Sequence, residues 1–334
     1  MTRAIDLVTF GEAMIRLSPP GFQRLEQTTQ LDVHIGGSEL NAAVAASHMG
    51  LSTSYVTRLT ANPLGRLVAS RTRLHGVDTS HVIWTAEDRV GTYYVEFGAS
   101  PRANSVIYDR AESAIARIEP GMVRWGAIFS DVKLFYTSGI TPALSSSATD
   151  ATLEAIDAAN SAGVRVCVDL NYRAKLWTEN RAREVMTAVA QKTDILFATE
   201  EDTFRVFGIR ESCYENVARR LADTFELEVV AITLRENPSV WKNRWTAIVY
   251  EAATDQIHQA ATYDIEVVDR VGSGDSFVGG FLCGYLQKGC EHGVRMGVAL
   301  SAIKQTIPGD LCWATPEEVE RVLNIDKSGL RIAR

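Results

Sequence analysis

The sequence predicts an α/β protein in which a mostly parallel sheet is covered by helices on both faces. Short apolar runs rich in β-branched residues recur along the chain, and segments with helical periodicity separate them. Strands that alternate with helices of this length form crossover units, and such units build parallel sheets with buried faces. The predicted strands are 5–10, 54–58, 133–137, 164–169, 194–197 and 229–233, and the predicted helices are 39–49, 63–75, 146–162, 181–191 and 213–225.

Two segments interrupt this alternation. Residues 12–35 contain a Ser-Pro-Pro-Gly stretch followed by an alternating run, and residues 89–110 contain an aromatic, strand-like run with no long helix after it. An excursion of this kind near the carboxyl ends of the strands is well placed to cover a ligand crevice. We therefore expect residues 1–334 to form one αβα domain with a small β lid built from about 12–35 and 89–110.

Composition indicates an ordinary globular protein. Hydrophobic residues make up 46%, charged residues 22%, and the formal net charge is −7. The absence of a long basic run argues against nucleic acid or an anionic membrane as the main partner. Five cysteines without a CxxC pair favour free thiols in a reducing compartment. Without a signal-peptide pattern or a run of about 20 apolar residues, the expected location is the cytoplasm.

The strongest chemical signal is a glycine-rich turn that leads into an apolar helical pattern at residues 268–280. Gly272 and Gly274 permit backbone angles that let successive amides point at one anion, and the positive end of a helix adds to the attraction. Asp275 then places a carboxylate beside the anion, an arrangement suited to phosphoryl transfer with Asp275 as the base. The alternative is a helix start with Asp275 as an ordinary capping residue. The chain has no Gly-Lys dipeptide and therefore no Walker-type loop.

A second signal lies near the start of the chain. Gly36 and Gly37 precede a predicted helix that carries Asn41. Paired glycines allow a ligand to approach the backbone closely, and the Asn41 amide supplies both a donor and an acceptor. Taken alone, this stretch is more typical of a tight strand-to-helix turn.

Together, in this order, the two motifs resemble those of the ribokinase-like (PfkB-type) carbohydrate kinases. The resemblance spans nearly the whole chain and implies a ribokinase-like αβα sandwich with ATP and Mg²⁺ as cofactors. It implies that Asp275 is the catalytic base and that Gly272, Ser273 and Gly274 form the anion hole. A homodimer paired through the lids is the expected oligomer.

Within that family the chain looks most like the 2-keto-3-deoxygluconate kinases. The similar stretches are 11–19, 102–110, 169–173 and 304–310. The substrate residues implied by the resemblance are Gly37, Asn41, Tyr94, Tyr108, Arg110 and Arg173, and the nucleotide residues are Asn171, Arg235, Asp310, Gly272 and Gly274.

A physical argument points the same way. A carboxylate is best bound by guanidinium forks, which Arg110 and Arg173 supply. Arg16 stands where sugar kinases for neutral substrates usually carry an Asp, and a cation there disfavours a neutral sugar. These residues favour a sugar acid, with fructose, ribose or another keto-deoxy acid as the alternative. Each arginine is equally compatible with a surface or phosphate-facing position.

Two positions depart from the family pattern. The usual Asn-x-x-Glu becomes Thr199-Glu200-Glu201-Asp202, so Glu201 or Asp202 is expected to help hold magnesium through water, or simply to favour a helix start. After the strand expected to end at Thr233, Arg235 stands where many relatives have a glycine-rich nucleotide loop. A less favoured alternative for the whole chain is a non-catalytic sugar-acid sensor, which intact Asp275 argues against.

Overall fold

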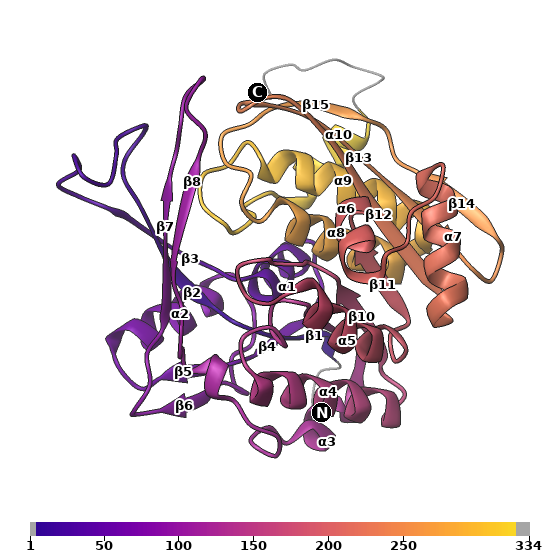
Figure 1. Ribbon diagram of the computed structural model, residues 1–334, viewed down its shortest axis with the longest axis horizontal. Coiled ribbons are helices and arrows are strands. Elements are labelled where there is room, and N and C mark those ends of the chain that lie inside the picture. The colour runs from indigo at the N-terminus through magenta and orange to yellow at the C-terminus, as the bar shows by residue number, and fades with distance from the viewer. Residues whose placement is uncertain (1–4, 325–334) are drawn as a thin grey trace.

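A mixed sheet of nine strands forms the centre of the computed structural model, which describes residues 5–324 except for the side chains of 237 and 238 (Figure 1). Six neighbouring strands are parallel, in the order β12-β11-β10-β9-β1-β4, and β13, β14 and β15 add to the β12 edge in antiparallel fashion. The strands of this sheet are β1 (Ile5–Phe10), β4 (Thr53–Val56), β9 (Val132–Ser138), β10 (Arg165–Asp169), β11 (Ile195–Ala198), β12 (Val229–Ser239), β13 (Lys242–Glu251), β14 (Gln256–Gln259) and β15 (Tyr263–Glu266).

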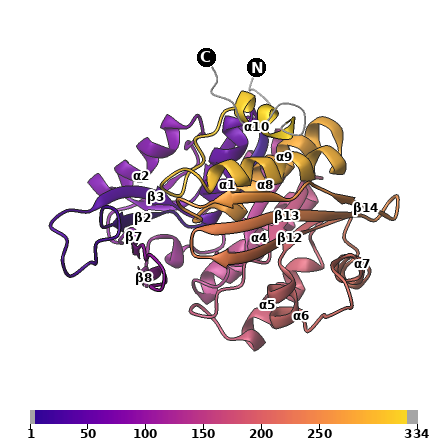
Figure 2. The ribbon, with the colours of Figure 1, turned by 90° about the horizontal axis from the view of Figure 1, so that it is seen from above.

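Helices cover both faces of this sheet. Figure 2 shows α1, α8 and α9 on one face and α4, α5, α6 and α7 on the other. The predicted fold class is therefore confirmed, as is each of the predicted helices. The helices are α1 (Ser38–His48), α2 (Pro63–Leu74), α3 (Trp125–Ile128), α4 (Ser146–Ser161), α5 (Glu179–Ala190), α6 (Glu200–Phe207), α7 (Tyr214–Phe225), α8 (Ser273–Lys288), α9 (Cys290–Lys304) and α10 (Pro316–Leu323), with 3-10 turns at Ile115–Arg117 and Phe129–Asp131.

Two hydrophobic clusters, one on each side of the sheet, hold the layers together. Continuous apolar strands such as β10 and β11 send alternate side chains into each cluster, as expected for strands buried on both faces. The pair α8 and α9 packs especially closely, because a Cβ on Gly284 would lie 2.9 Å from the Cα of Gly293. This packing fixes the start of α8 relative to the strand ends.

A second sheet of four strands, which we call the small sheet, stands beside the central one. Its order is β3-β2-β7-β8, with β2 parallel to β7 and antiparallel to β3. Its strands come from the two segments that interrupt the αβ alternation. They are β2 (Met14–Ser18), β3 (Asp32–Gly36), β7 (Gly91–Glu96) and β8 (Ser105–Asp109), and a separate pair is formed by β5 (Arg58–Thr60) and β6 (Ile83–Thr85).

Two strands differ from their predictions. The strand expected at 54–58 ends at Val56, and Arg58 begins β5 of the separate pair. We expected the strand after α7 to end at Thr233, but β12 continues to Ser239 and forms a long hairpin with β13. The sequence interpretation placed residues 234–237 after the strand, because many relatives have a glycine-rich nucleotide loop there. Cross-strand pairing with β13 supplies the backbone hydrogen bonds that the local sequence does not predict. Among residues 5–324, no helix is long and apolar enough to cross a membrane.

Candidate active site

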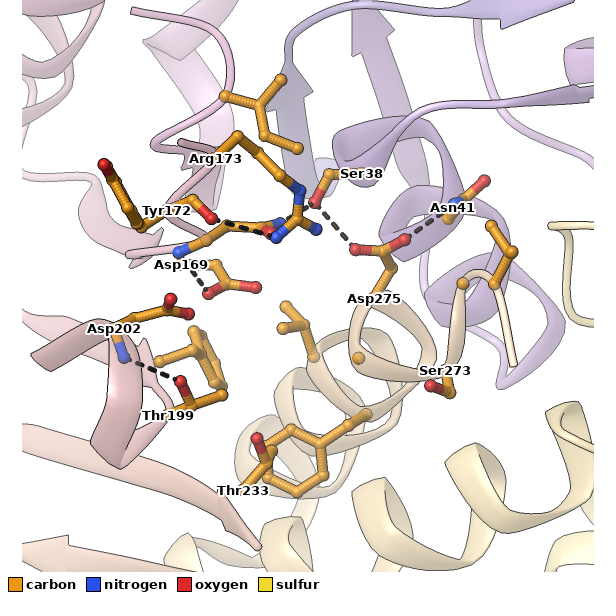
Figure 3. A pocket seen from close by; sticks show the side chains of 18 of the residues that line it. Ser38, Asn41, Asp169, Tyr172, Arg173, Thr199, Asp202, Thr233, Ser273 and Asp275 are labelled. Carbon is orange, nitrogen blue, oxygen red and sulfur yellow. Dashed lines mark hydrogen bonds between the residues drawn. The ribbon is translucent and has the colours of Figure 1, made fainter. Parts of the chain in front are cut away.

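A cavity of about 590 Å³ opens where the carboxyl ends of the parallel strands meet the small sheet and the start of α8. In open α/β sheets, ligands bind at this edge. The volume lies in the range of small-molecule sites, from roughly 300 to 1,000 Å³. Figure 3 shows polar side chains from α1, α6, α8 and the end of β10 pointing into it.

Asp275 lies at the centre of the cavity, in the first turn of α8. Its Oδ1 accepts a hydrogen bond from the Ser38 hydroxyl at 2.8 Å, and its Oδ2 accepts one from the Asn41 amide at 2.7 Å. Burial raises the pKa of Asp275, and the bonds from Asn41 and Ser38 oppose that rise because they stabilise the carboxylate. A desolvated carboxylate fixed at both oxygens is a suitable proton acceptor.

The turn before Asp275 has the backbone geometry that the glycines suggested. Gly272 caps α8 with a φ of 81°, a conformation that favours glycine. The amide of Ser273 bonds the carbonyl oxygen of Arg270, and the amide of Ser276 bonds that of Gly272. The amides of Gly274 and Asp275 lie in the first helical turn, where backbone donors lack intrahelical acceptors. These two amides can bind an anion beside the Asp275 carboxylate.

Ser38 links Asp275 to the end of β10. Its hydroxyl oxygen accepts a hydrogen bond at 2.9 Å from the amide of Asn171, whose own backbone has a positive φ of 36°. The amide N–H of Asn171 bonds Asp169 Oδ1 at 3.1 Å. Asn171 therefore positions Ser38 as well as lining the cavity.

Glu39 anchors this first turn of α1 from behind. Its Oε1 accepts three hydrogen bonds, from the amide and hydroxyl of Ser138 and the hydroxyl of Thr141, at 2.7 to 3.0 Å. Gly11 leaves room for the carboxylate, since a Cβ there would lie 2.2 Å from it. Burial raises the pKa of Glu39 to about 7.

Two carboxylates face Asp275 across the cavity, those of Asp169 and Asp202 (Figure 3). Burial raises the pKa of Asp169, and the nearby charges of Asp275 and Asp202 raise it further; burial also raises the pKa of Asp202. Glu201 lies at the rim, where it pairs with Arg205 at 2.8 Å. Carboxylates that repel one another in this way fit a divalent cation placed between them.

No group of three or more potential ligands close enough to chelate a metal directly occurs within residues 5–324. Mg²⁺ commonly keeps several waters and uses only one or two protein carboxylates. Asp202 and Asp169 therefore fit a magnesium ion held through water. The sequence interpretation gave Asp169 no role of its own, although it is the first residue of the selected stretch 169–173.

The small sheet contributes aromatic side chains to the cavity. The structure brings Tyr93 to the cavity instead of Tyr94, because adjacent residues of β7 point to opposite faces. Tyr93 stacks on Tyr108 with ring centroids 5.7 Å apart. The selection of Tyr94 from the sequence therefore does not match the side chains that line the cavity.

Arg110 lines the cavity beside Tyr108, but it also forms a buried ion pair with Glu12. Glu12 additionally accepts a hydrogen bond from Ser113 at 2.7 Å. The Nε of Arg110 is buried without a hydrogen-bond partner among residues 5–324. The guanidinium of Arg110 is thus engaged by Glu12, and its Nε is shielded from solvent. Glu12 gave no signal in the sequence beyond its place after a strand glycine.

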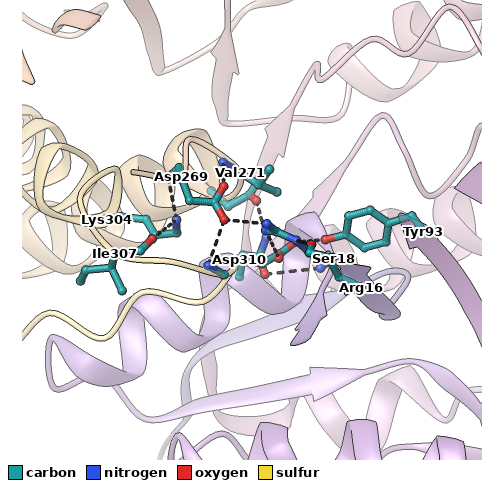
Figure 4. A network of polar contacts seen from close by, with 12 residues as sticks. Arg16, Ser18, Tyr93, Asp269, Val271, Lys304, Ile307 and Asp310 are labelled. Atoms are coloured by element: carbon teal, nitrogen blue, oxygen red, sulfur yellow. Dashed lines mark hydrogen bonds and ion pairs between the residues drawn. The ribbon is translucent and has the colours of Figure 1, made fainter. Parts of the chain in front are cut away.

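Arg16 does not reach the cavity. Figure 4 shows its guanidinium between Asp269, at 2.7 Å, and Asp310, at 2.8 Å. All three side chains are buried, and the hydroxyl of Tyr93 also donates to Asp310. The argument that Arg16 disfavours a neutral sugar is therefore wrong, because two carboxylates already neutralise it. Asp310, expected near the nucleotide, is held by Arg16 and Tyr93 on the small-sheet side.

Two other arginines selected from the sequence lie at the rim. Arg173 and Arg235 are exposed and line the cavity, and Arg173 donates to the carbonyl of Tyr172 at 3.2 Å. Gly37 packs closely against the backbone of Glu12, since a Cβ on Gly37 would lie 1.9 Å from the Glu12 carbonyl oxygen. The selected residues that the structure brings to this cavity are Gly37, Asn41, Tyr108, Arg110, Asn171, Arg173, Glu201, Asp202, Arg235, Gly272, Ser273, Gly274, Asp275 and Asp310.

The chain is similar over most of its length to known carbohydrate kinases. A model of the pfkB family of carbohydrate kinases matches residues 4–311. A 2-dehydro-3-deoxygalactonokinase from Haloferax volcanii is 39% identical over 326 residues, which cover 97% of this chain and 98% of that protein. A 2-dehydro-3-deoxygluconokinase from Thermoproteus tenax is 29% identical over 325 residues, covering 96% and 94%.

Solved structures agree with these relatives. The structure of a 2-dehydro-3-deoxygluconokinase from Thermotoga maritima superposes with a TM-score of 0.93 and 39% identity, covering 96% of this chain and 99% of that one. The prefixes 2-dehydro and 2-keto denote the same group, so these similarities and the resemblance seen in the sequence agree.

Proposed function

Since the chain belongs to the pfkB family of carbohydrate kinases, we propose that it transfers the terminal phosphoryl group of ATP to the terminal hydroxyl of a sugar acid. The substrate we favour is 2-keto-3-deoxygluconate, which would become its 6-phosphate. Its galactonate epimer is a close second, because relatives named for each epimer have similar sequences.

The observation that supports this proposal best is the fixed position of Asp275. Its carboxylate accepts hydrogen bonds from Ser38 and Asn41 and lies at the start of α8, next to the amides that can bind an anion. In the proposed reaction Asp275 accepts the proton of the attacking hydroxyl. The amides of Gly274 and Asp275 then stabilise the charge on the phosphoryl group in transfer.

The nucleotide is proposed to lie on the α6 and β12 side of Asp275. Arg235 at the rim and Asn171 at the end of β10 are placed to contact its phosphates. Kinases of this family use ATP with Mg²⁺. When bound, magnesium neutralises charge on the phosphates, and Asp202 and Asp169 are the residues that would hold it through water.

Selection of a sugar acid is proposed to rest mainly on Arg173. Its side chain lines the cavity and is not engaged by a carboxylate closer than 4.0 Å among the ion pairs of residues 5–324. Arg110 and Tyr108 line the cavity together with Arg173. Charge-assisted bonds of this kind recognise a carboxylate.

A neutral sugar such as fructose is the second candidate, and one observation favours it. Arg16 is sequestered by two aspartates and Arg110 is paired with Glu12, so two of the three arginines that suggested an acid are already neutralised. The discrimination between the candidates therefore depends on whether Arg173 contacts the substrate.

The test is ADP release by the purified protein with ATP and magnesium. The acceptors are 2-keto-3-deoxygluconate, its galactonate epimer, fructose, ribose and adenosine. We expect turnover on the keto-deoxy acids. Arg173→Met should then raise KM for the acid without a comparable effect on KM for ATP. Turnover on fructose or ribose alone would contradict the acid substrate and retain the kinase activity.

Asp275→Asn tests the proposed base. Amide for carboxylate keeps the shape and removes the proton acceptor, so we expect kcat to fall by about 10²- to 10⁴-fold with KM little changed. The matched control is Asp157→Asn. Asp157 is an exposed residue of α4 that pairs with Lys192. A near-normal rate in the Asp275 variant would contradict the assigned role.

A further inference from the structure

The buried Arg16 guanidinium connects the small sheet with the segment that leads into the anion-binding turn. Arg16 lies on β2, whereas Asp269 and Asp310 lie close to the start and the end of the α8–α9 region. Its Nε also donates to Ser18 at 3.0 Å, and its plane lies over the ring of Phe97 at 5.4 Å. The guanidinium therefore has a fixed position and bridges elements 294 residues apart.

Asp269 carries this connection to the anion-binding turn. Its Oδ1 accepts the amide of Val271 at 3.0 Å, and its Oδ2 accepts the amide of Gly309 at 2.9 Å in addition to Arg16. Val271 immediately precedes Gly272, the cap of α8. The position of the Asp269 side chain thus determines how the chain enters the turn.

Asp310 carries the connection back to the substrate side. Its carboxylate accepts hydrogen bonds from Arg16 and from Tyr93, which are paired neighbours on β2 and β7. Its backbone packs against the turn, because a Cβ on Gly272 would lie 2.1 Å from the Asp310 carbonyl oxygen. Tyr93, which lines the cavity, and Gly272 are therefore held in contact with one residue.

The charges in this cluster balance. Arg16 and Lys304 contribute two positive charges, Asp269 and Asp310 two negative ones, and all four side chains are at most 1% exposed. The Lys304 ammonium donates to the backbone carbonyls of Asp269, at 3.0 Å, and Ile307, at 3.2 Å. Buried ion pairs contribute little net stability compared with apolar packing, but they fix geometry. Such a cluster is suited to holding the segments that carry its side chains in fixed positions.

We propose that Arg16 is a positioning residue of the phosphoryl transfer, holding the small sheet and the anion-binding turn in one register through Asp269 and Asp310. It contacts neither the substrate nor the nucleotide. The expected effect of Arg16 on the reaction rate rests on the proposed kinase function. Its structural part, the restraint on the turn, does not depend on that function.

The first variant is Arg16→Lys. Lysine keeps the charge but cannot bridge two carboxylates with a planar fork. We expect kcat to fall by about 10- to 100-fold, since displacement of aligned groups slows the chemical step. KM for the acceptor and for ATP should change by less than about threefold, because neither is contacted. Amides of residues 270–275 should exchange hydrogen for deuterium faster than in the wild type.

The matched control is Arg58→Lys. Arg58 is also an arginine with little exposure that pairs with a buried carboxylate: its Nη1 lies 2.5 Å from Asp88 and donates to the carbonyl of Ala114 at 2.7 Å, and Arg58 does not line the cavity. The Arg58→Lys substitution should leave kcat and the amide hydrogen exchange of residues 270–275 unchanged. Asp310→Asn, nearly isosteric, is the second variant if Arg16→Lys does not fold, and it should show the same pattern to a smaller extent.

Three results would overturn the inference. Normal kcat with normal exchange at 270–275 would show that the turn does not need Arg16. A rise in KM for the sugar acid alone would show direct substrate contact. Equal effects in the Arg58 variant would show general destabilisation. If the wild type phosphorylates no sugar, the proposed function fails, and the exchange comparison still decides whether Arg16 restrains the turn.

Discussion

Replacing Asn41 by leucine removes two hydrogen bonds, of which one is made to the proposed catalytic base. Asn41 is buried, and its amide donates to Asp275 Oδ2 at 2.7 Å while its oxygen accepts the amide of Gly37 at 3.3 Å. Leucine has a similar volume and no donor. The substitution therefore leaves one oxygen of a buried carboxylate without its partner, while Ser38 continues to hold the other.

The structure gives the sign and scale of the effect. Burial raises the pKa of Asp275, and the bond from Asn41 lowers it, so loss of that bond raises the pKa further. A hydrogen bond to a charged group contributes about 1.5 to 3 kcal/mol. At about 1.4 kcal/mol per pKa unit, the pKa of Asp275 should rise by about one to two units. Because the carboxylate is the active form, the acid limb of kcat/KM should move to higher pH.

The assay is ADP release measured from about pH 5 to pH 9 for the wild type and Asn41→Leu. Asn160→Leu is the control, since Asn160 is exposed on α4 and its side-chain amide donates to the backbone carbonyl of Lys192 at 3.0 Å. An acid limb at the same pH in Asn41→Leu and the wild type would refute the reasoning. A shift to lower pH would show that the sign is wrong.

Three further predictions concern other parts of the fold. Gly272→Ala should abolish most activity. The φ of 81° favours glycine, and a Cβ on residue 272 would lie 2.1 Å from the carbonyl oxygen of Asp310. The measurement that checks this is kcat of the folded variant. The pKa of Glu39 is raised by burial to about 7, so the folded state binds its proton more tightly and the wild type loses stability as pH rises from about 4.5 through 7. Glu39→Gln removes that titration. The Tm of the variant relative to the wild type should therefore be higher at about pH 8 than at about pH 5. An equal Tm difference at the two pH values would contradict the prediction. Leu221→Ala, in the fully buried face of α7, should lower the free energy of unfolding by about 2 to 5 kcal/mol in urea titration and leave kcat per folded molecule intact.

The sequence by itself determined the layered α/β fold and the position of the proposed base. Apolar strands and helical periodicity are local patterns, and they predicted the six parallel strands and the helices between them. The turn at Gly272 also depends on local chemistry, because a φ of 81° favours glycine. These features follow from residues close together in the chain.

Only the tertiary structure decided what each charged residue contacts. Arg16 reads in the sequence as a cation near a ligand, but Asp269 and Asp310, more than 250 residues away in the chain, enclose it. Similarly, Tyr93 and Tyr94 are indistinguishable until pairing within the small sheet determines which of them faces the cavity.

Ser38, Glu12 and Asp169 were missed for the same reason. Each acts through a partner brought near it by folding, and no local pattern distinguishes an engaged side chain from a solvated one. The features that the sequence predicts and those that only the tertiary structure decides differ in how far apart in the chain the interacting residues lie. Backbone conformation and burial are determined largely by neighbouring residues, whereas the net charge offered to a ligand depends on which distant groups fold around it.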